Sequence, residues 1–343
     1  MFKAIPQIIE SFYSMKIYKF INIPLNIITG LFPFSISEVG IYLILLFFFY
    51  KILVLFKNLI QGKIIFKSFK PILIIVKRIL LYACVIYFSF LCLWGLNYHR
   101  IPFADAANIK VNQYSKKNLE ELCLHLIEQA NLLREEVNEN SLGIMTIPQG
   151  KRWVLENANI GFDNISNVYN TLSGQYGKPK PVLLSEFMCY TGIAGIYFPF
   201  TGEANININV PYPNLPSTVT HEMAHQRGYA REDEANFIAY LSSVSNPYVE
   251  FKYSGTLLAL THSVNALYKE DKEIYEKLKG NFSEGLLRDL NHINSFWEKY
   301  EGPIERASTD LNNAYLKANN QKDGIKSYGR MVDLLIAYYI ENK

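Results

Sequence analysis

Cysteine is scarce in this sequence, and no two cysteines have the spacing that binds metals or carries redox chemistry. The 343 residues include four, at positions 84, 92, 123 and 189, and none belongs to a CxxC pair. The absence of CxxC excludes a zinc knuckle and a thioredoxin-like motif. Cys84 and Cys92 fall inside an apolar run. For Cys123 and Cys189 two outcomes stay open, a disulfide or two buried thiols.

Acidic residues are absent from one long stretch, residues 39–104. Residues 1–97 contain ten Lys/Arg against two acids, a balance of +8, whereas the remaining residues contain 24 against 29, a balance of −5. The basic part is also the apolar part, so its charges indicate membrane topology rather than nucleic-acid binding. We therefore expect a lipid bilayer, and no nucleic acid, among the partners of the protein.

Two apolar runs predict transmembrane helices. Residues 79–98 carry no charge, and twenty helical residues span about 30 Å, the thickness of a hydrocarbon core. Residues 39–56 carry only Lys51, whose charge can reach the interface from near the end of a helix; the alternative for this run is a helix buried in a protein core. Trp94 and Tyr98 are expected at the outer membrane surface, where amphipathic rings settle.

Charge predicts the orientation of these spans. The residues between them favour a cytoplasmic loop because six are basic: Lys57, Lys63, Lys67, Lys70, Lys77 and Arg78. The expected parts are an interfacial helix within residues 1–37, two spans in residues 38–98, and an extracytoplasmic domain in residues 99–343. The interfacial helix is inferred from five apolar residues at helical spacing: Ile5, Ile8, Ile9, Phe12 and Met15. The sequence thus predicts a multi-pass protein of the cell membrane.

The residues after 99 predict an α+β domain in which helices dominate. Residues 118–138 have the apolar spacing of an amphipathic helix. Residues 204–210 alternate strictly between apolar residues and asparagine, the pattern of a strand with one buried face. Beyond residue 215 the pattern is helical almost to the end. The expected fold is therefore mostly helical with a small β-sheet.

The sequence His221-Glu222-Met223-Ala224-His225 is an HExxH motif, which indicates metal-dependent hydrolysis. Histidines at i and i+4 lie on one face of a helix, so both imidazoles can bind one zinc ion. Glu222 lies beside this face and can act as general base on a water whose pKa zinc lowers from about 16 towards 7. Pro216 and a capping hydroxyl after it predict the start of the helix, and Gly228 predicts its end.

Glu232 is the predicted third metal ligand. A catalytic zinc ion commonly takes three protein ligands and leaves the fourth position to water. Glu232 and Asn236 share one face of the next predicted helix, with the small residues Ala235 and Ala239 flanking that face. Asn236 is expected to orient a ligand histidine through its other ring nitrogen. Glu234, about 200° away around the helix, remains the alternative ligand.

HExxH followed by ExxAN resembles the gluzincin class of zinc peptidases, in which two histidines and a downstream glutamate hold the metal. The two spans together with Gly202–Asn205, His221–Gly228 and Arg231–Phe237 resemble more closely one family of uncharacterised bacterial membrane proteins, known only as a domain of unknown function. The resemblance implies the ligand and base roles given above and names no substrate. Asn236 stands where several gluzincins have aspartate.

We therefore predict a membrane-anchored zinc metallohydrolase, a peptidase that acts on peptides or proteins of the cell envelope. The alternatives are a zinc hydrolase of a non-peptide amide or ester, and a non-catalytic envelope scaffold with a zinc site. Residues 204–210, or the neighbouring residues 195–198, are expected to pair with an extended substrate; the alternative is an ordinary internal strand. The oxyanion needs a stabilising side chain near the metal, and Tyr328, His262 and Arg231 are the candidates.

Overall fold

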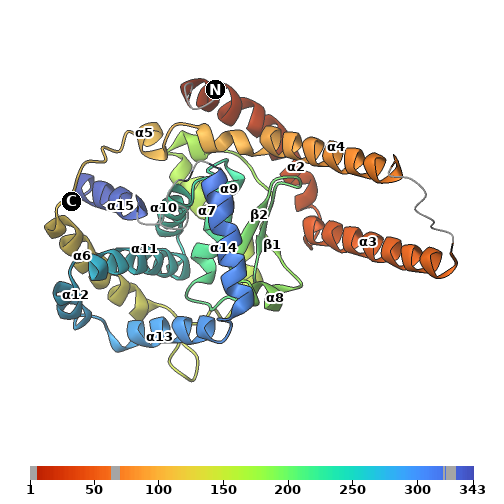
Figure 1. The fold of residues 1–343 in the computed structure, drawn as a ribbon. Helices are drawn as coiled ribbons and strands as arrows, with labels where there is room; N and C mark the ends of the chain where they lie inside the picture. Colours follow the sequence, from red (N-terminus) through yellow and green to blue (C-terminus); the bar gives the residue numbers. More distant parts are fainter. Residues whose placement is uncertain (1–5, 63–69, 320, 322–329) are drawn as a thin grey trace.

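A computed structural model describes residues 6–62, 70–319, 321 and 330–343. Figure 1 shows a rounded helical domain from one side of which two long helices project, α3 (Ile36–Ile60) and α4 (Lys70–Leu93). A small three-stranded sheet lies on the side of the domain from which they project. The fold is mostly helical with a small sheet, as predicted.

The other elements complete the domain. Its further α-helices are α1 (Pro6–Ile8), α2 (Lys19–Gly30), α5 (Phe103–Ala107), α6 (Lys116–Glu136), α7 (Gly150–Ser166), α8 (Ser185–Tyr190), α9 (Leu215–Gln226), α10 (Glu232–Val244), α11 (Val249–Glu270), α12 (Lys272–Lys279), α13 (Glu284–Glu298), α14 (Pro303–Ala318) and α15 (Arg330–Glu341). The strands are β1 (Lys180–Pro181), β2 (Gly195–Phe198) and β3 (Glu203–Ile206). Residues Ile9–Tyr18 form a π-helix, and Gly95–His99 and Asn170–Leu172 form 3-10 turns.

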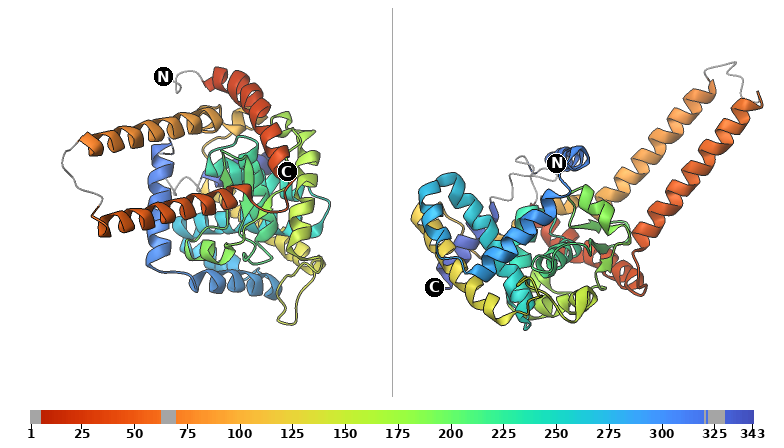
Figure 2. Two further views of the ribbon diagram at one scale, coloured as in Figure 1. Left: turned by 90° about the vertical axis from the view of Figure 1, so that its right-hand side faces the viewer. Right: turned by 90° about the horizontal axis from the view of Figure 1, so that it is seen from below.

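The helices α3 and α4 are long and apolar enough to cross a membrane. They run alongside each other from the same face of the domain (Figure 2). The first predicted span lies within α3, but the prediction for residues 79–98 is wrong at both ends, because α4 begins at Lys70 and ends at Leu93. Trp94 and Tyr98 do not face outward from the protein, because both rings are buried in an aromatic cluster with Tyr18 and Tyr197. Their position at the level of the outer membrane surface stays a prediction.

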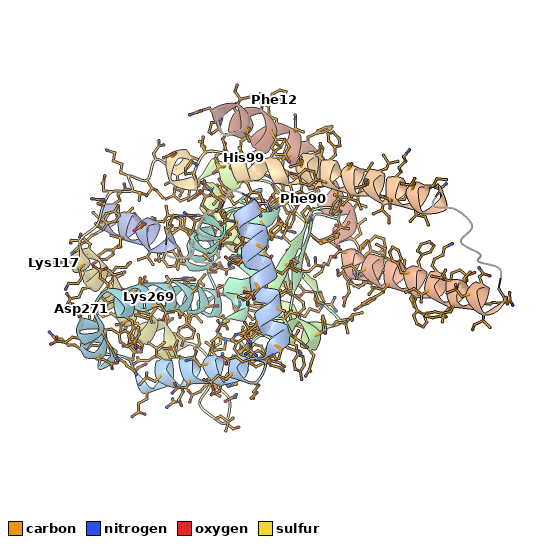
Figure 3. The ribbon with its side chains drawn as sticks, viewed as in Figure 1. Phe12, Phe90, His99, Lys117, Lys269 and Asp271 are labelled. Atoms are coloured by element: carbon orange, nitrogen blue, oxygen red, sulfur yellow. The ribbon has the colours of Figure 1, made fainter. Side chains whose placement is uncertain are left out.

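The segment before α3 packs along the domain. Ile9 and Tyr18 are buried, whereas Ile8 and Phe12 on the opposite side are exposed, and Figure 3 shows Phe12 pointing away from the domain. Ile5 lies outside the described residues. An interfacial role for the exposed side of this segment stays a prediction, but its other side is part of the protein core.

The core of the domain forms where α6, α7, α9, α10 and α11 pack together. The predicted helix 118–138 is α6, which starts at Lys116 because Ser115 and Asn118 form a capping box. Cys123 and Cys189 are both buried free thiols, so no disulfide joins them. The domain is stabilised by apolar burial without a covalent cross-link between these two residues.

β3 is the central strand of the sheet, parallel to β1 and antiparallel to β2. All four of its residues are buried, so the prediction of a strand over residues 204–210 with one buried face is wrong in length and in exposure. The chain leaves the sheet at Asn207, whose side chain donates to Ile193 O (3.0 Å) and accepts from Asn209 N (2.9 Å). Asparagine side chains that bind nearby backbone groups compete with strand pairing.

Two carboxylates hold the junction between α3 and the sheet. Glu203 in β3 accepts hydrogen bonds from the N–H groups of Ile36 (2.9 Å) and Ser37 (2.8 Å) in the first turn of α3. Glu38 in α3 accepts two hydrogen bonds, each 2.9 Å long, from the two N–H groups that precede α8. Both glutamates are buried. Because a carboxylate satisfies the free N–H groups of a helix N-terminus and is stabilised by the helix dipole, this clamp makes α3 and the sheet one unit.

Replacing Glu203 by glutamine should weaken this clamp. The amide keeps the size of the side chain but loses the charge and one of the two acceptors, and hydrogen bonds to charged groups contribute about 1.5–3 kcal/mol. We expect the melting temperature of the full-length protein in detergent to fall by several degrees. Glu276→Gln, at an exposed position of α12, is the control and should leave it unchanged. Equal melting temperatures for the two variants would contradict the clamp.

Candidate metal centre

The HExxH motif lies on α9, which packs against α10 at close range. Thr220 of α9 donates to Ala239 O (3.3 Å) and is 2.9 Å from the hydroxyl of Ser243. Ala235 and Ala239 are fully buried. Small side chains let two helices approach closely, which brings the N-terminal residue of α10, Glu232, next to the histidines.

The ends of α9 differ in how well the sequence predicts them. The helix begins at Leu215 with Pro216 in its first turn, and no side chain caps it. The predicted hydroxyl cap is therefore wrong; Ser217 instead donates to Asn214 O (3.0 Å). The predicted end is confirmed, since the helix stops at Gln226 and Gly228 adopts a φ of 82°.

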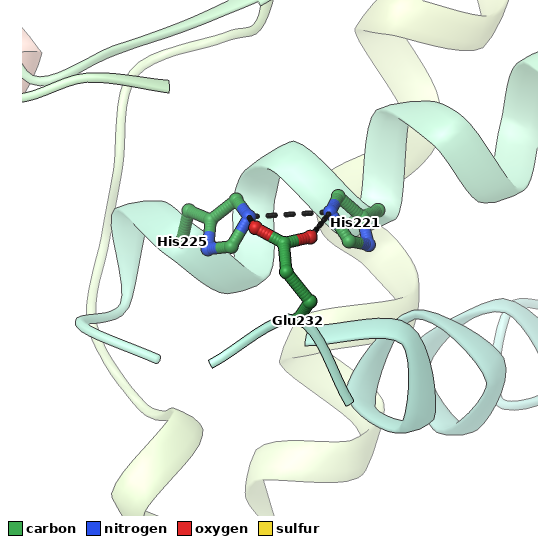
Figure 4. A group of neighbouring side chains, drawn as sticks. All are labelled: His221, His225 and Glu232. Atoms are coloured by element: carbon green, nitrogen blue, oxygen red, sulfur yellow. Dashed lines mark hydrogen bonds and ion pairs between the residues drawn. The ribbon is translucent and has the colours of Figure 1, made fainter. Parts of the chain in front are cut away.

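Three predicted ligands converge between α9 and α10 (Figure 4). The Nε2 atoms of His221 and His225 lie 3.2 Å apart, and the two rings are almost perpendicular. One carboxylate oxygen of Glu232 is 3.3 Å from His221 Nε2, and the other is 3.7 Å from His225 Nε2. The ligand atoms all lie within 4.8 Å of one another. The alternative ligand Glu234 is used elsewhere: it accepts from Phe103 N (2.7 Å) and from Arg231 (2.5 Å).

These distances fit a tetrahedral zinc ion. With Zn–N bonds of about 2.1 Å, two nitrogen ligands of such an ion lie about 3.4 Å apart, close to the 3.2 Å between the two Nε2 atoms. Two neutral imidazoles and one carboxylate are also donors that zinc takes in catalytic sites. His221, His225 and Glu232 could therefore hold the ion without rearrangement of their helices.

Side chains that precede α3 or follow α4 donate hydrogen bonds to carbonyl groups at the end of α9 and in the turn after it. Tyr18 donates to His225 O (3.3 Å) and Gln226 O (3.0 Å), and Asn22 donates to Gln226 O (2.8 Å). Arg100 donates to Gly228 O (3.0 Å) in the following turn. A helix leaves its last four carbonyls without intrahelical partners. Here residues 227–229 donate to Met223 O, Ala224 O and His225 O, and the segment before α3 supplies the donors for Gln226 O.

His225 is oriented by this turn. Its Nδ1 lies 2.7 Å from Tyr229 O, which leaves Nε2 to face the other ligands. The Arg100 guanidinium stacks 4.0 Å from the centre of the Tyr229 ring and forms a buried ion pair with Glu10, with the nearest atoms 2.6 Å apart. Trp94 packs edge to face on the His225 ring, with centroids 5.8 Å apart. Glu10, Arg100 and Trp94 thus fix the orientation of the His225 ring, although they are not themselves metal ligands.

His221 interacts with both acids of the motif. Burial lowers its pKa, but hydrogen bonding and charge of Glu232, the charge of Glu222 and a contact with Asn236 outweigh it and raise the pKa. Its Nδ1 atom is buried and has no partner at hydrogen-bonding geometry among the described residues. The predicted orientation of a ligand histidine by Asn236 through the other ring nitrogen therefore stays a prediction.

Glu222 lies beside the three ligands and is almost completely buried. Burial raises its pKa to about 8; the charge of Glu232 acts in the same direction, while His221 and the backbone N–H of Tyr197 oppose the change. Gly195 faces this carboxylate so closely that a Cβ atom would lie 2.6 Å from its Cγ and Oε1. A glycine is therefore needed in β2 to leave room for Glu222.

The structure places the three predicted candidates for oxyanion stabilisation differently. His262 lies near His221, which together with burial lowers its pKa to about 4. Arg231 forms an ion pair with Glu234, and Tyr328 lies outside the described residues. Sequence reasoning missed Tyr98 and Tyr315, whose hydroxyls are 3.1 Å apart and whose pKa values are both affected by Glu232. No sequence signal distinguishes Tyr315 among 24 tyrosines.

A comparison with protein families gives one match, to a family described as "Protein of unknown function (DUF3810)", over residues 13–336. The chain belongs to this family. No curated protein and no solved structure matches the chain. The family match begins within the π-helix Ile9–Tyr18 and so includes α3, α4 and Tyr18, as well as all the residues of the candidate metal centre.

The buried pair of Glu10 and Arg100 should control metal affinity. Glu10→Gln removes one charge, frees the guanidinium from its position and loosens the turn that orients His225, so zinc affinity should fall about tenfold or more. Asp289→Asn is the matched control, because Asp289 pairs with buried Arg134 (2.7 Å) far from the ligands. Both variants should lower the melting temperature, but only Glu10→Gln should weaken zinc in a chelator competition. Equal zinc affinities would show that the turn does not depend on this pair.

Proposed function

We propose that this protein is a membrane-anchored zinc hydrolase that cleaves peptide bonds. The single observation that carries the proposal is the convergence of His221, His225 and Glu232 beside the buried carboxylate of Glu222. Within the described ranges the cluster has three members, whereas structural zinc usually has four protein ligands. Three ligands and an adjacent base favour a catalytic site over a scaffold.

In this mechanism Glu222 is the general base. Bound zinc supplies Lewis acidity that makes water a nucleophile at neutral pH. Glu222 takes the proton of the attacking water at its carboxylate, which lies beside the three ligands. It then delivers this proton to the amine that leaves. Tyr315 and His262 lie near the ligands and are the candidates to donate to the developing oxyanion, while Tyr98 donates to the Tyr315 hydroxyl (3.1 Å) and positions it.

The sheet supports a polypeptide substrate. β3 cannot pair with one because it is central, but β2 is the edge strand, and no strand among the described residues covers its other side. Asn207 N donates a hydrogen bond to Ala194 O, and in an antiparallel pair every second residue is hydrogen-bonded to the partner strand. The main-chain N–H and C=O groups of Gly195 and Tyr197 therefore point away from β3, toward the open edge of the sheet. The backbone N–H of Tyr197 donates to the Glu222 carboxylate. An extended peptide paired with this edge would pass directly beside the base.

The proposed location is the outer side of the cell membrane. The loop between the spans is basic and contains no acid, which favours a cytoplasmic loop. The domain and the segment before α3 then lie together on the opposite side. Their contacts support one common side for both parts, since Tyr18 and Asn22 bind the end of α9. The proposed substrates are accordingly peptides or proteins of the cell envelope.

Metal analysis of purified variants tests the proposal. Wild-type protein should hold about one zinc ion per chain, Glu222→Gln should keep it and lose all hydrolysis, and His221→Ala and Glu232→Ala should lose it. Glu234→Gln is the matched control: it alters a buried glutamate two positions from Glu232 and should retain the metal. Zinc loss in Glu234→Gln with retention in Glu232→Ala would refute the ligand set. Full hydrolysis by Glu222→Gln would refute the base.

Gly195→Ala should separate metal binding from catalysis. The added methyl group would push the Glu222 carboxylate from its position, and a displacement of about 1 Å can cost roughly a hundredfold in rate. Zinc content should not change, because the three ligands are untouched. Gly40→Ala is the control, since a Cβ there meets no atom within 4 Å. An unchanged hydrolysis rate in Gly195→Ala would mean that Glu222 does not act from this position.

A further inference from the structure

We propose that the substrates are polypeptides anchored in the same membrane, and that they are cut in the segment that emerges from the bilayer. This inference depends on the proposed peptidase function and on α3 and α4 crossing the bilayer. It is carried by the height of the metal centre above the end of α4, by the two attachments of the domain to its spans, and by the open edge of β2.

The end of α4 marks where the bilayer stops. Residues 73–93 are the apolar part of this helix, and 21 helical residues span about 32 Å, close to the 30 Å of a hydrocarbon core. Side chains are strongly exposed up to Phe88, which is 67% exposed, and are buried from Trp94, which is 4% exposed. The hydrocarbon boundary therefore falls between Phe88 and Trp94, a rise of about 9 Å along the helix.

The metal centre lies directly against this boundary. The Trp94 ring contacts His225, with centroids 5.8 Å apart. Four residues earlier, Phe90 contacts Tyr315 of α14, with centroids 6.4 Å apart; Figure 3 shows Phe90 at the domain end of α4 beside α14. Because each headgroup layer is only about 5–8 Å thick, the ligands lie at or just above the level of the lipid headgroups.

The domain is attached on both sides of the site and cannot lift the site away. At one attachment, α4 ends against α9 through Trp94. At the other, α3 begins against β3 through the clamp of Glu203 and Glu38. Both spans leave the same face of the domain (Figure 2). A rigid connection at two points holds β2 and the metal centre at a fixed height.

This height selects the substrate class. A folded soluble protein would have to bring an extended segment down to the lipid surface, whereas the segment that joins a membrane anchor to its outer domain is already there. Confinement to the same membrane also raises the effective concentration of such a segment. The outward main-chain groups of Gly195 and the outward carbonyl of Tyr197 can pair with any extended chain, so recognition by height does not require a particular sequence.

A paramagnetic ion tests the height without any hydrolysis. Full-length protein in phosphatidylcholine vesicles is loaded with one Cu²⁺, and the transverse relaxation of the lipid phosphorus nuclei is measured. We expect the lipid phosphorus nuclei to relax faster with copper-loaded wild type than without copper, and we expect no such increase with His221→Ala. A control copper site is made on α12, on the far side of the domain in Figure 1, by Lys272→His with Glu276→His in the His221→Ala background; it should bind copper and leave the lipid signal unchanged.

The outcomes separate the two proposals. If wild type binds no copper, the ligand set and with it the proposed function fail. If copper binds as tightly as expected but the lipid signal matches the α12 control, the metal lies far from the headgroups and the inference about substrates is overturned, while the hydrolase proposal stands.

Cleavage in vesicles gives the second measurement. One peptide that the enzyme cuts is presented free, fused directly to a transmembrane anchor, or fused through a rigid helical spacer that lifts it about 40 Å. The directly anchored form should be cut at least tenfold faster than the free form, and the lifted form should lose this advantage. Equal rates for all three forms would overturn the inference, and Glu222→Gln in parallel excludes contaminating proteases.

Discussion

The need for hydrogen-bond donors at Gln226 O and in the turn after α9 is the constraint on which the rest of the structure depends. α9 has twelve residues, so its last turn contains His225 itself. Tyr18, Asn22 and Arg100 donate to the carbonyls of this turn and the one that follows. Tyr18 and Asn22 lie before α3, and Arg100 lies just after α4. The metal centre is therefore completed by the segments on either side of the membrane helices.

The centre of the site was predictable because it is local. His221 and His225 are one helical turn apart, and Glu232 follows seven residues later, so helix geometry and one short turn place all three. The two apolar helices were predictable from composition for a similar reason, since runs of about twenty residues with at most one charge are long and apolar enough to form a spanning helix. Even so, composition misplaced the end of α4, because Trp94 and Tyr98 are apolar enough to extend the run.

Contacts between distant residues were not predictable. Tyr18 and Gln226 are 208 residues apart, and nothing near Tyr18 marks it as a donor to a metal helix. Composition also divides the chain at residue 99, but Arg100 binds both Glu10 and the turn after α9, so that boundary separates residues that act together. The asparagines of residues 205–209 suggested a longer strand because alternation alone does not reveal that their side chains bind the backbone.

If α3 and α4 are inserted in the membrane as proposed, the dependence of α9 on the segments at both ends of this region has a consequence for biosynthesis. A chain emerging from the ribosome exposes its first helices long before residues 221–232 exist, and the donors at residues 18, 22 and 100 would reach a common compartment only after both helices had been inserted. The histidine pair would then be held in its final orientation only at the end of insertion. Translocation would become the step that assembles the site, and a chain that failed to insert would leave its HExxH helix without the partners that complete it.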